Sequence, residues 1–402
     1  MEIIGRDAIW KIKGCVQNYP WGGKSYIPDL ICEANEEDLP FAELWFGQHP
    51  VCPSMTTTGS SLDELMAVMP ELILTAAEQN TWGNQLPFLC KILDVKSMLS
   101  IQIHPTKEQA MAGFEQEEAE GIPMTAPHRT FRDRNHKPEL MFALSEFYLL
   151  HNFRSDSEIR LLLSNISELR SIYEVFIERG LDEFYRWLMD LDQATINQLL
   201  GPFVEELRSG KVFDDMTSPE YWINQAIDQY CTADKIDRGI LSFYLMNIVR
   251  LQPGEVIFQD SGIPHAYLRG QNVEIMASSD NVIRGGLTSK FINSSALSNL
   301  VRFDSRSIFR LTAEVGEDGR RTFSPPVEEF RLSVINLTPS NPFELQVPSV
   351  SLLFSTCNCF KVASPTQDIR VGGGEALLVR AGSMVKLRSR GAAQIFIVQG
   401  QR

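Results

Sequence analysis

Residues 99–105 read Leu-Ser-Ile-Gln-Ile-His-Pro, and polar and apolar side chains alternate along them. Successive side chains of a strand point to opposite faces, so Ser100, Gln102 and His104 share one face and the two isoleucines share the other. If the isoleucines face a core, Gln102 and His104 project together into a barrel interior or a pocket. Such a strand can supply half of a metal site, although a Gln-x-His strand is more often only a polar face.

The sequence on both sides of this stretch predicts strands that are interrupted once by helices. Residues before 150 and after 250 show short strand patterns bounded by Gly and Pro turns, which favour a sandwich or a closed barrel. Between them, Ser155 and Glu158 form a capping box ahead of apolar residues at helical spacing, and Ser218 precedes a further helix. We therefore predict a mainly β chain with an inserted α-helical domain.

Three units follow from these patterns. One β domain is assembled from residues 1–154 and 247–312, and residues 155–246 form the inserted helical domain. Residues 313–402 form a further β domain at the C-terminus.

The composition describes a globular chain with an excess of acidic residues. The 402 residues include 37 lysines and arginines against 51 aspartates and glutamates, so the formal charge is −14. A nucleic acid or an anionic membrane would be repelled unless a local basic patch overrides this charge. The first seven residues contain no apolar leader, and no window approaches the roughly 18 apolar residues of a membrane span. We expect a cytoplasmic protein with no nucleic-acid or membrane partner.

The seven cysteines agree with that location. Most are scattered, and only Cys357 and Cys359 lie close together. No second cysteine pair or nearby histidine completes a tetrahedral metal site around these two. We therefore interpret the cysteines as buried free thiols.

Later segments carry further groups that can bind a metal or take part in catalysis. Residues 135–139 place a histidine, a lysine and Glu139 before an apolar run, although a solvated loop entering a strand is the alternative. Residues 264–267 place His265 in a turn between two strand patterns. Residues 274–290 mix many charged types with apolar residues and a double glycine, which is hard to explain as scaffold. The polar residues of that segment include Glu274, Asp280, Asn281, Arg284 and Lys290.

Seven segments between residues 17 and 290 match sequence motifs of one known family, and they occur in the same order as in that family. They are Gln-Asn-Tyr-Pro-Trp-Gly at 17–22, Ala-Glu-Leu-Trp-Phe-Gly at 42–47, Pro-Phe-Leu-Cys-Lys at 87–91, residues 99–105, Asn-His-Lys-Pro-Glu-Leu at 135–140, Pro-His-Ala-Tyr-Leu at 264–268, and residues 274–290. On these motifs the chain resembles the type I mannose-6-phosphate isomerases, or phosphomannose isomerases. The resemblance implies a cupin fold, in which a metal-bearing jelly-roll β-barrel is interrupted by a helical domain. It also implies that a second, metal-free cupin-like domain follows at the C-terminus.

The resemblance implies one zinc ion per chain, held by a glutamine, two histidines and a glutamate. Carried over by motif, the ligands are Gln102, His104, Glu139 and His265. Imidazole, carboxylate and amide donors form a mixed site that suits zinc and would also accept cobalt or manganese. Because no thiolate is involved and a water or sugar oxygen can join, such a site is catalytic rather than structural.

The resemblance also implies the reaction, which interconverts mannose 6-phosphate and fructose 6-phosphate. Removal of a proton next to a carbonyl gives an enediolate, and a cation stabilises this species as a Lewis acid. Arg284 matches the active-site arginine of the family, and it either stabilises that charge or binds sugar oxygens. Lys137, Glu274 and Asp280 are the candidate proton carriers, with structural ion pairing as the alternative for each.

The substrate phosphate needs a local basic cluster on this acidic chain. Ser100 and Lys290 are our candidates for binding it because both belong to matching motifs, and Lys91 and Arg284 are further contributors. We expect a monomer that takes a small sugar phosphate as its partner.

Three nearby groups receive mainly structural interpretations. His49 is expected to pack or hydrogen-bond in the barrel wall. His136 is a loop residue, with a place beside the metal ligands as the alternative. Tyr19 and Trp21 are expected in the core, with stacking on a sugar as the alternative.

Two other functions stay open at this point. Cys90 and Ser289 stand where the family usually has phenylalanine and proline, which leaves room for an isomerase of another sugar or sugar phosphate. The alternative from a different class is a non-catalytic cupin that binds metal and sugar. The retention of Arg284, Lys137 and Glu274 beside all four ligands speaks against that alternative.

Overall fold

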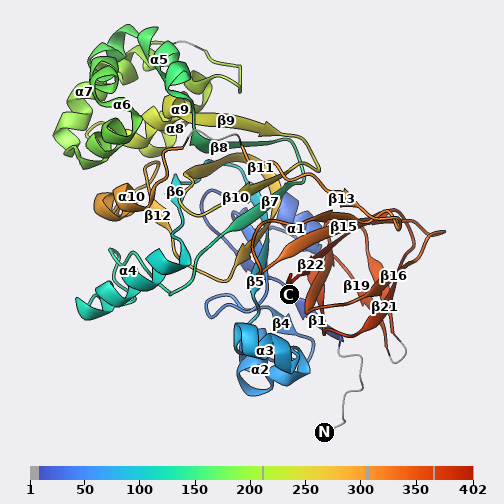
Figure 1. The fold of residues 1–402 in the computed structure, drawn as a ribbon. Coiled ribbons are helices and arrows are strands. Elements are labelled where there is room, and N and C mark those ends of the chain that lie inside the picture. Colours follow the sequence, from blue (N-terminus) through green and yellow to red (C-terminus); the bar gives the residue numbers. More distant parts are fainter. Residues whose placement is uncertain (1–8, 211, 305–307, 365–366, 402) are drawn as a thin grey trace.

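The computed structural model describes residues 9–210, 212–304, 308–364 and 367–401. Its strands form three sheets, and a group of helices lies at one end of the largest sheet (Figure 1). The chain is therefore mostly sheet with a helical portion, as the sequence predicts. The first residues, in which we expect no leader, lie outside the described ranges.

The largest sheet has ten strands in the described residues, and we call it the large sheet. Its main path runs in the order β10, β7, β11, β5, β3, β2, while β6 and β8 also pair with β11, β12 pairs with β6, and β9 pairs with β8. The strands are β2 (Cys15–Gln17), β3 (Glu43–Phe46), β5 (Phe88–Val95), β6 (Gln102–Ile103), β7 (Glu139–Ala143), β8 (Phe147–Phe153), β9 (Met246–Leu251), β10 (Val256–Gln259), β11 (His265–Ala277) and β12 (Ile283–Arg284).

Strand β11 connects the two parts of this sheet. Its first residues pair with β6 and β8, and its second half pairs with β5 and β7. The register shifts between Tyr267 and Arg269, and Gly270 follows with a φ of 126°. A Cβ atom at Gly270 would lie 2.6 Å from the Phe147 ring, so this position of the strand needs glycine. The bend lets one strand place His265 beside β6 and Glu274 beside β5.

The other two sheets, which we call the C-terminal sheets, have eight and four strands in the described residues. The eight-stranded sheet runs β13, β14, β15, β22, β17, β20, β1, β4, and the four-stranded sheet runs β16, β21, β18, β19. The strands are β1 (Ile9–Lys13), β4 (Met55–Thr56), β13 (Glu314–Val315), β14 (Arg321–Phe323), β15 (Arg331–Leu337), β16 (Phe343–Gln346), β17 (Ser351–Ser355), β18 (Phe360–Ala363), β19 (Asp368–Val371), β20 (Glu375–Val379), β21 (Met384–Ser389) and β22 (Ala393–Gln399). Strand β1 pairs with β20, which lies at the other end of the sequence.

Two apolar cores lie on opposite faces of the eight-stranded sheet. One face packs on the four-stranded sheet through aliphatic residues such as Leu353, Leu387 and Ile395. The other face packs on the large sheet, where the ring of Phe354 stacks 5.4 Å from that of Phe46. These contacts fix the C-terminal sheets against the back of the large sheet, so its other face is left for the site.

Seven helices of the described residues lie between residues 156 and 245 and cover one end of the large sheet (Figure 1). They are α5 (Asp156–Ser164), η2 (Ser167–Leu169), α6 (Arg170–Asp190), α7 (Gln193–Arg208), α8 (Pro219–Tyr230), η3 (Arg238–Leu241) and α9 (Ser242–Leu245). The predicted caps are confirmed, because the Ser155 side chain accepts from the Glu158 N–H and the Ser218 side chain accepts from the Tyr221 N–H. Apolar faces of these helices form a core with β8 and β9 at this end of the sheet.

Further helices lie between the strands. They are α1 (Tyr26–Ile31), α2 (Leu62–Val68), η1 (Pro70–Leu72), α3 (Ala76–Trp82), α4 (Lys107–Ala119) and α10 (Ser294–Leu300). Among the helices of the described residues, none combines the length and the apolar character that crossing a bilayer requires.

The interpretation of all cysteines as buried free thiols is wrong. Cys15 and Cys52 form a disulfide with their Cα atoms 5.6 Å apart, and Cys357 is exposed. The pairing of β2 with β3 sets Cys15 opposite Trp45, and the chain then returns to bring Cys52 alongside. Spacing in sequence does not reveal such a return. Cys90 is a buried free thiol, as expected.

Candidate metal centre and active site

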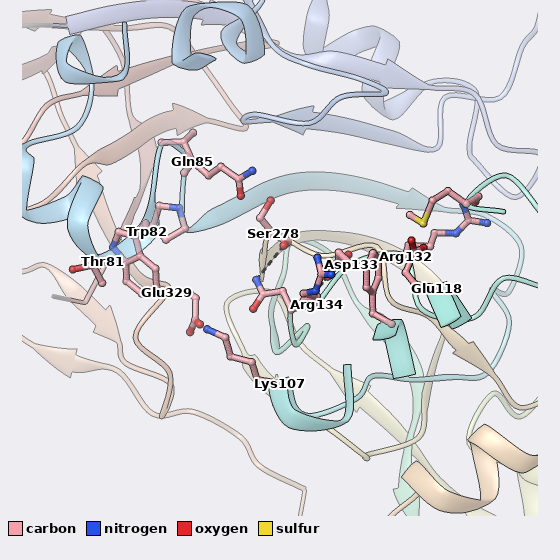
Figure 2. A pocket seen from close by; sticks show the side chains of 15 residues that line it. Thr81, Trp82, Gln85, Lys107, Glu118, Arg132, Asp133, Arg134, Ser278 and Glu329 are labelled. Carbon is pink, nitrogen blue, oxygen red and sulfur yellow. Dashed lines mark hydrogen bonds between the residues drawn. The ribbon is translucent and has the colours of Figure 1, made fainter. Parts of the chain in front are cut away.

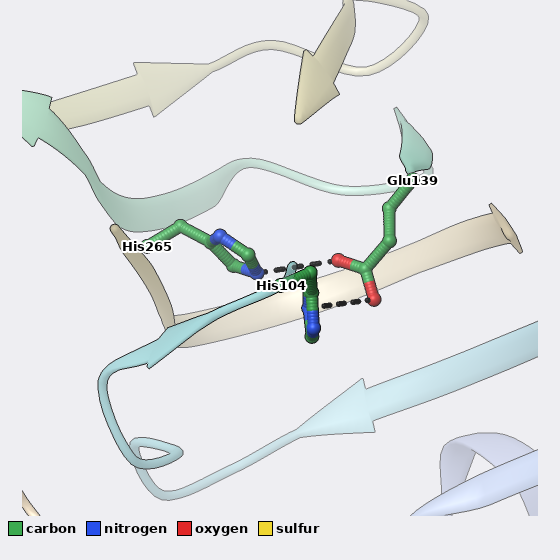
Figure 3. Close-up of side chains that lie close together, drawn as sticks. All are labelled: His104, Glu139 and His265. Atoms are coloured by element: carbon green, nitrogen blue, oxygen red, sulfur yellow. Dashed lines mark ion pairs between the residues drawn. The ribbon is translucent and has the colours of Figure 1, made fainter. Parts of the chain in front are cut away.

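Three strands of the large sheet bring two histidines and a glutamate together (Figure 3). His104 directly follows β6, Glu139 begins β7 and His265 begins β11. Glu139 Oε1 lies 3.3 Å from His104 Nε2, and Glu139 Oε2 lies 3.2 Å from His265 Nε2. The three residues are at most 1% exposed, and their ligand atoms all lie within 4.8 Å of one another. The distances fit ligands grouped around one metal ion.

Both imidazole rings are oriented by hydrogen bonds from their other nitrogen. His104 Nδ1 donates to the backbone carbonyl of Asn281 at 2.7 Å, and His265 Nδ1 donates to that of Ile263 at 3.0 Å. With the proton on Nδ1, each Nε2 directs a lone pair toward Glu139. Burial lowers the pKa of His104 to about 4, so this ring is neutral at physiological pH.

The ligand atoms have unused hydrogen-bonding capacity in a dry environment. Within the described residues, His104 Nε2 and His265 Nε2 are buried and have no hydrogen-bond partner. Lone pairs that converge in this way are costly unless a cation lies between them. Imidazole nitrogens and a carboxylate oxygen are donors that zinc accepts. The residues of this centre therefore fit a metal ion such as zinc.

Gln102 is the predicted fourth ligand, and its backbone lies beside that of the predicted ligand His265. In β6 it pairs with His265 of β11 on one side and with Arg284 of β12 on the other. Strand alternation sets Gln102 on the same face as His104. Its role as a ligand stays a prediction that this register supports.

A row of buried charged side chains continues from the centre along the large sheet. Lys137 Nζ lies 3.0 Å from Glu139 Oε1. Farther along, Lys91 Nζ lies 3.6 Å from Glu274 Oε2 and 3.4 Å from Glu43 Oε2. All five side chains belong to residues that are at most 8% exposed. The predicted carriers Lys137 and Glu274 are thus brought to one face with the metal ligands.

The surroundings act differently on the two central carboxyl groups. Burial, followed by repulsion from Glu139, raises the pKa of Glu274. Burial acts in the same direction on Glu139, but Lys137 and His104 hold the pKa of Glu139 well below its usual value. Glu139 therefore remains charged, while the carboxylate of Glu274 is the better proton acceptor of the two.

Lys91 and Glu43 are buried charged residues of this face that the sequence reasoning undervalued or missed. Lys91 lies between two carboxylates and 4.5 Å from the centre of the Trp45 ring, and Glu43 accepts a hydrogen bond from the Trp45 indole. Burial lowers the pKa of Lys91, but Glu43 and Glu274 outweigh this effect and raise it. A signal was available, because Lys91 interrupts the apolar run Phe-Leu-Cys-Lys-Ile-Leu and a lysine is rarely buried unless it is paired.

Asp280 lies at an edge of the site rather than in its interior. Its side chain is 46% exposed, and both carboxylate oxygens lie 3.2 Å from His49 Nε2, so His49 hydrogen-bonds as expected. Burial acts to raise the pKa of Asp280, but the hydrogen bond with His49 brings it below the usual value. Tyr19 is 37% exposed and stacks on Trp21 with ring centres 5.9 Å apart, so its expected place in the core is wrong.

Arg284 and Lys290 form a basic cluster with Arg132. Burial, and after it the charge of Arg132, lowers the pKa of Arg284. Burial, then Arg284 and Arg132, lowers the pKa of Lys290. The three cations therefore lie within electrostatic range of one another, which suits a group with two negative charges. Ser100 is half-buried and lies two residues before Gln102, outside the short strand β6.

His136 pairs with Glu329, and no hydrogen bond in the described residues joins its side chain to a predicted metal ligand. His136 Nε2 lies 2.6 Å from Glu329 Oε1 in the segment before β15. In an extended segment, positions 136 and 139 point to opposite faces. Beside this ion pair lies a cavity of about 620 Å³, lined by residues from α3, α4, residues 132–135 and Glu329 (Figure 2). Several of its charges have protein partners, such as Glu115 for Arg134 and His136 for Glu329.

Together, the sheet and this charged face define a metal-dependent enzyme with a buried centre of two histidines and a glutamate. The comparisons with known proteins identify the family. A model of the catalytic domain of type I phosphomannose isomerase matches residues 9–156. The mannose-6-phosphate isomerase of Salmonella typhimurium is 36% identical over 81% of this chain and 83% of its own length. The chain belongs to the mannose-6-phosphate isomerase family.

Further relatives cover nearly the whole chain. The mannose-6-phosphate isomerase of Escherichia coli is 33% identical over 95% of this chain and 97% of its own length. A crystal structure of mannose 6-phosphate isomerase bound with zinc and yttrium is similar with a TM-score of 0.86. That similarity covers 98% of this chain and 100% of the other, at 32% identity.

Proposed function

We propose that this protein is a zinc-dependent aldose–ketose isomerase that interconverts mannose 6-phosphate and fructose 6-phosphate. The observation that carries the proposal is the buried group of His104, Glu139 and His265, in which both imidazole Nε2 atoms face the carboxylate and have no hydrogen-bond partner in the described residues. The relatives named mannose-6-phosphate isomerase and the zinc-bound structural neighbour support it.

The reaction moves a hydrogen between C1 and C2 of the sugar. We propose that His104, Glu139, His265 and Gln102 hold one zinc ion, which supplies Lewis-acid stabilisation of the enediolate when bound. Cobalt or manganese could replace zinc at these nitrogen and oxygen donors.

Among the three candidate proton carriers, Glu274 has the surroundings that suit the role best. Its pKa is raised by burial and by Glu139, and a general base works best when its pKa lies near the operating pH. Lys137 is paired with Glu139, and the exposed Asp280 is paired with His49. We assign proton transfer to Glu274 and the binding of sugar oxygens or of the enediolate charge to Arg284.

The basic cluster is the proposed binding place of the substrate phosphate. Lys290 and Ser100 are the predicted contacts, and Arg132 adds a third group that lies within electrostatic range of Arg284 and Lys290. Clustered cations concentrate an anion locally even on an acidic protein, because charges beyond about 8 Å are largely screened at physiological salt.

The finer structural predictions also stay proposals. We propose that the large sheet belongs to a cupin jelly-roll and that the C-terminal sheets form a second, cupin-like domain. The proposed units are residues 1–154 with 247–312, residues 155–246 and residues 313–402, although the pairing of β1 with β20 crosses these boundaries. A cytoplasmic location and a monomeric state remain predictions, and the Cys15–Cys52 disulfide counts against a fully reduced chain.

The decisive experiment is a coupled assay that follows the conversion of mannose 6-phosphate to fructose 6-phosphate. We expect activity in the purified protein, loss of activity after removal of metal by a chelator, and recovery when zinc is added back. Cobalt and manganese serve as comparison metals. Binding of the sugar phosphate without turnover, in a protein loaded with zinc, would show a metal- and sugar-binding protein instead.

A further inference from the structure

Gln259 is a buried amide beside the metal centre to which the sequence assigned no role. It ends β10 and pairs directly with Glu139 at the start of β7. Its exposed fraction is 0%. A buried glutamine in an otherwise apolar strand, Val-Ile-Phe-Gln, loses its hydration on folding and needs partners within the protein.

The amide nitrogen of Gln259 has two acceptors. Nε2 donates to Tyr267 Oη at 2.8 Å and to Glu139 Oε2 at 3.3 Å. Oε2 is the oxygen that also faces His265 Nε2. The two hydrogens of one amide group thus serve a metal ligand and a tyrosine, and this fixes which way the amide is turned.

Tyr267 extends this contact to the proposed proton carrier. Its hydroxyl donates to Glu274 Oε1 at 2.9 Å. A hydroxyl has a single hydrogen, so the donation from Gln259 to the tyrosine oxygen leaves that hydrogen directed toward Glu274. The chain of hydrogen bonds therefore has one direction, from Gln259 through Tyr267 to Glu274.

We propose that Gln259 is a positioning residue, which holds the carboxylate of Glu139 in the orientation that binds the metal and directs the Tyr267 hydroxyl toward Glu274. The inference rests on the proposed function for its metal centre. Groups that hydrogen-bond to metal ligands fix the orientation of those ligands, and their loss typically weakens metal affinity. An amide suits this place because it donates to the carboxylate without adding a charge to a site that already holds three buried carboxylates and two lysines.

The test compares Gln259→Leu with a matched control, Gln399→Leu. Gln399 is also buried, donates its amide to Ser351 Oγ at 2.8 Å and lies in β22 of the C-terminal sheets, away from the metal centre. Zinc affinity of the metal-free proteins is measured by competition with a chromogenic chelator. We expect Gln259→Leu to raise the zinc Kd by about 10–100-fold and Gln399→Leu to leave it unchanged.

A second readout separates positioning from general stability. The melting temperature of each variant is measured with and without zinc. A purely structural glutamine would lower both values equally, whereas loss of positioning reduces the increase in Tm that zinc produces. If Gln259→Leu does not fold, Gln259→Met, which keeps the length of the side chain without a donor, takes its place.

The inference is overturned if zinc affinity and the zinc-dependent increase in Tm match the wild type in a folded Gln259 variant. Its failure can be told apart from failure of the proposed function. If the wild-type protein binds zinc but does not isomerise mannose 6-phosphate, the proposed function is contradicted. The role of Gln259 in orienting the metal ligand Glu139 is not contradicted by that result.

Discussion

The large sheet and the C-terminal sheets use the same strand alternation but bury different side chains. On the face of the large sheet that carries the site, Lys91 of β5 and Glu274 of β11 occupy inward positions. Between the C-terminal sheets, the corresponding interior is filled by residues such as Leu353, Leu387 and Ile395. Similar strands thus build a reaction site in one region and an apolar core in the other.

The difference shows where this fold gains stability and where it gives stability up. Burial of aliphatic side chains stabilises the C-terminal sheets by roughly 1.5–3 kcal/mol for each. Buried charges cost several kcal/mol each unless they are paired, which is why Lys91 lies between Glu43 and Glu274. We therefore expect substitutions in the large sheet to change activity most, and substitutions in the C-terminal sheets to change stability most.

The largest effect is expected for His265→Ala, which removes a metal ligand from the large sheet. Zinc content, measured by mass spectrometry, should fall to background. The isomerase rate should fall by more than about 10³-fold, because several kcal/mol of transition-state stabilisation are lost with the ion.

His128→Ala is the matched control for this variant, because His128 is exposed and contacts the Phe291 ring rather than the centre. It should keep zinc and activity. A His265→Ala protein that retains stoichiometric zinc would show that the metal lies elsewhere.

In the C-terminal sheets, Ile395→Ala should have the opposite profile. Ile395 is fully buried, so the substitution should lower the free energy of unfolding by about 2–5 kcal/mol, measured by chemical denaturation. The milder Ile395→Val should cost about 0.5–1.5 kcal/mol. In both, kcat and KM of the folded protein should match the wild type. A lower kcat with unchanged zinc content would show that the two regions are coupled more closely than their separate cores indicate.

The comparison also shows which parts of the fold can be predicted from sequence. Local signals were sufficient for the helices that follow Ser155 and Ser218, since their caps involve residues three positions apart. The pairing of β1 with β20 joins residues more than 350 positions apart, and the sequence of neither strand indicates which strand it pairs with. For the same reason the Cys15–Cys52 disulfide was missed.

In the site, motifs pointed to residues that the structure brings together, whereas a contact made across neighbouring strands left no motif. His104, Glu139 and His265 stand in motifs that match the family, and the structure brings all three together. Gln259 lies outside those motifs, and only the register of β10 with β7 reveals its contact with Glu139. A role that depends on cross-strand register has no signature in the strand itself.

The smallest effect is expected for Lys290→Ala, which tests the proposed phosphate-binding cluster beside the large sheet. Lys290 is exposed and shares its surroundings with Arg284 and Arg132, so the remaining cations keep part of the attraction for a phosphate. We expect the KM for mannose 6-phosphate to rise about fivefold, which corresponds to about 1 kcal/mol, with zinc content unchanged. Lys361→Ala, an exposed lysine of β18 in the C-terminal sheets, is the matched control and should leave KM unchanged. An equal KM in both variants would remove Lys290 from the phosphate site and leave Arg284 and Arg132 as the cations that bind it.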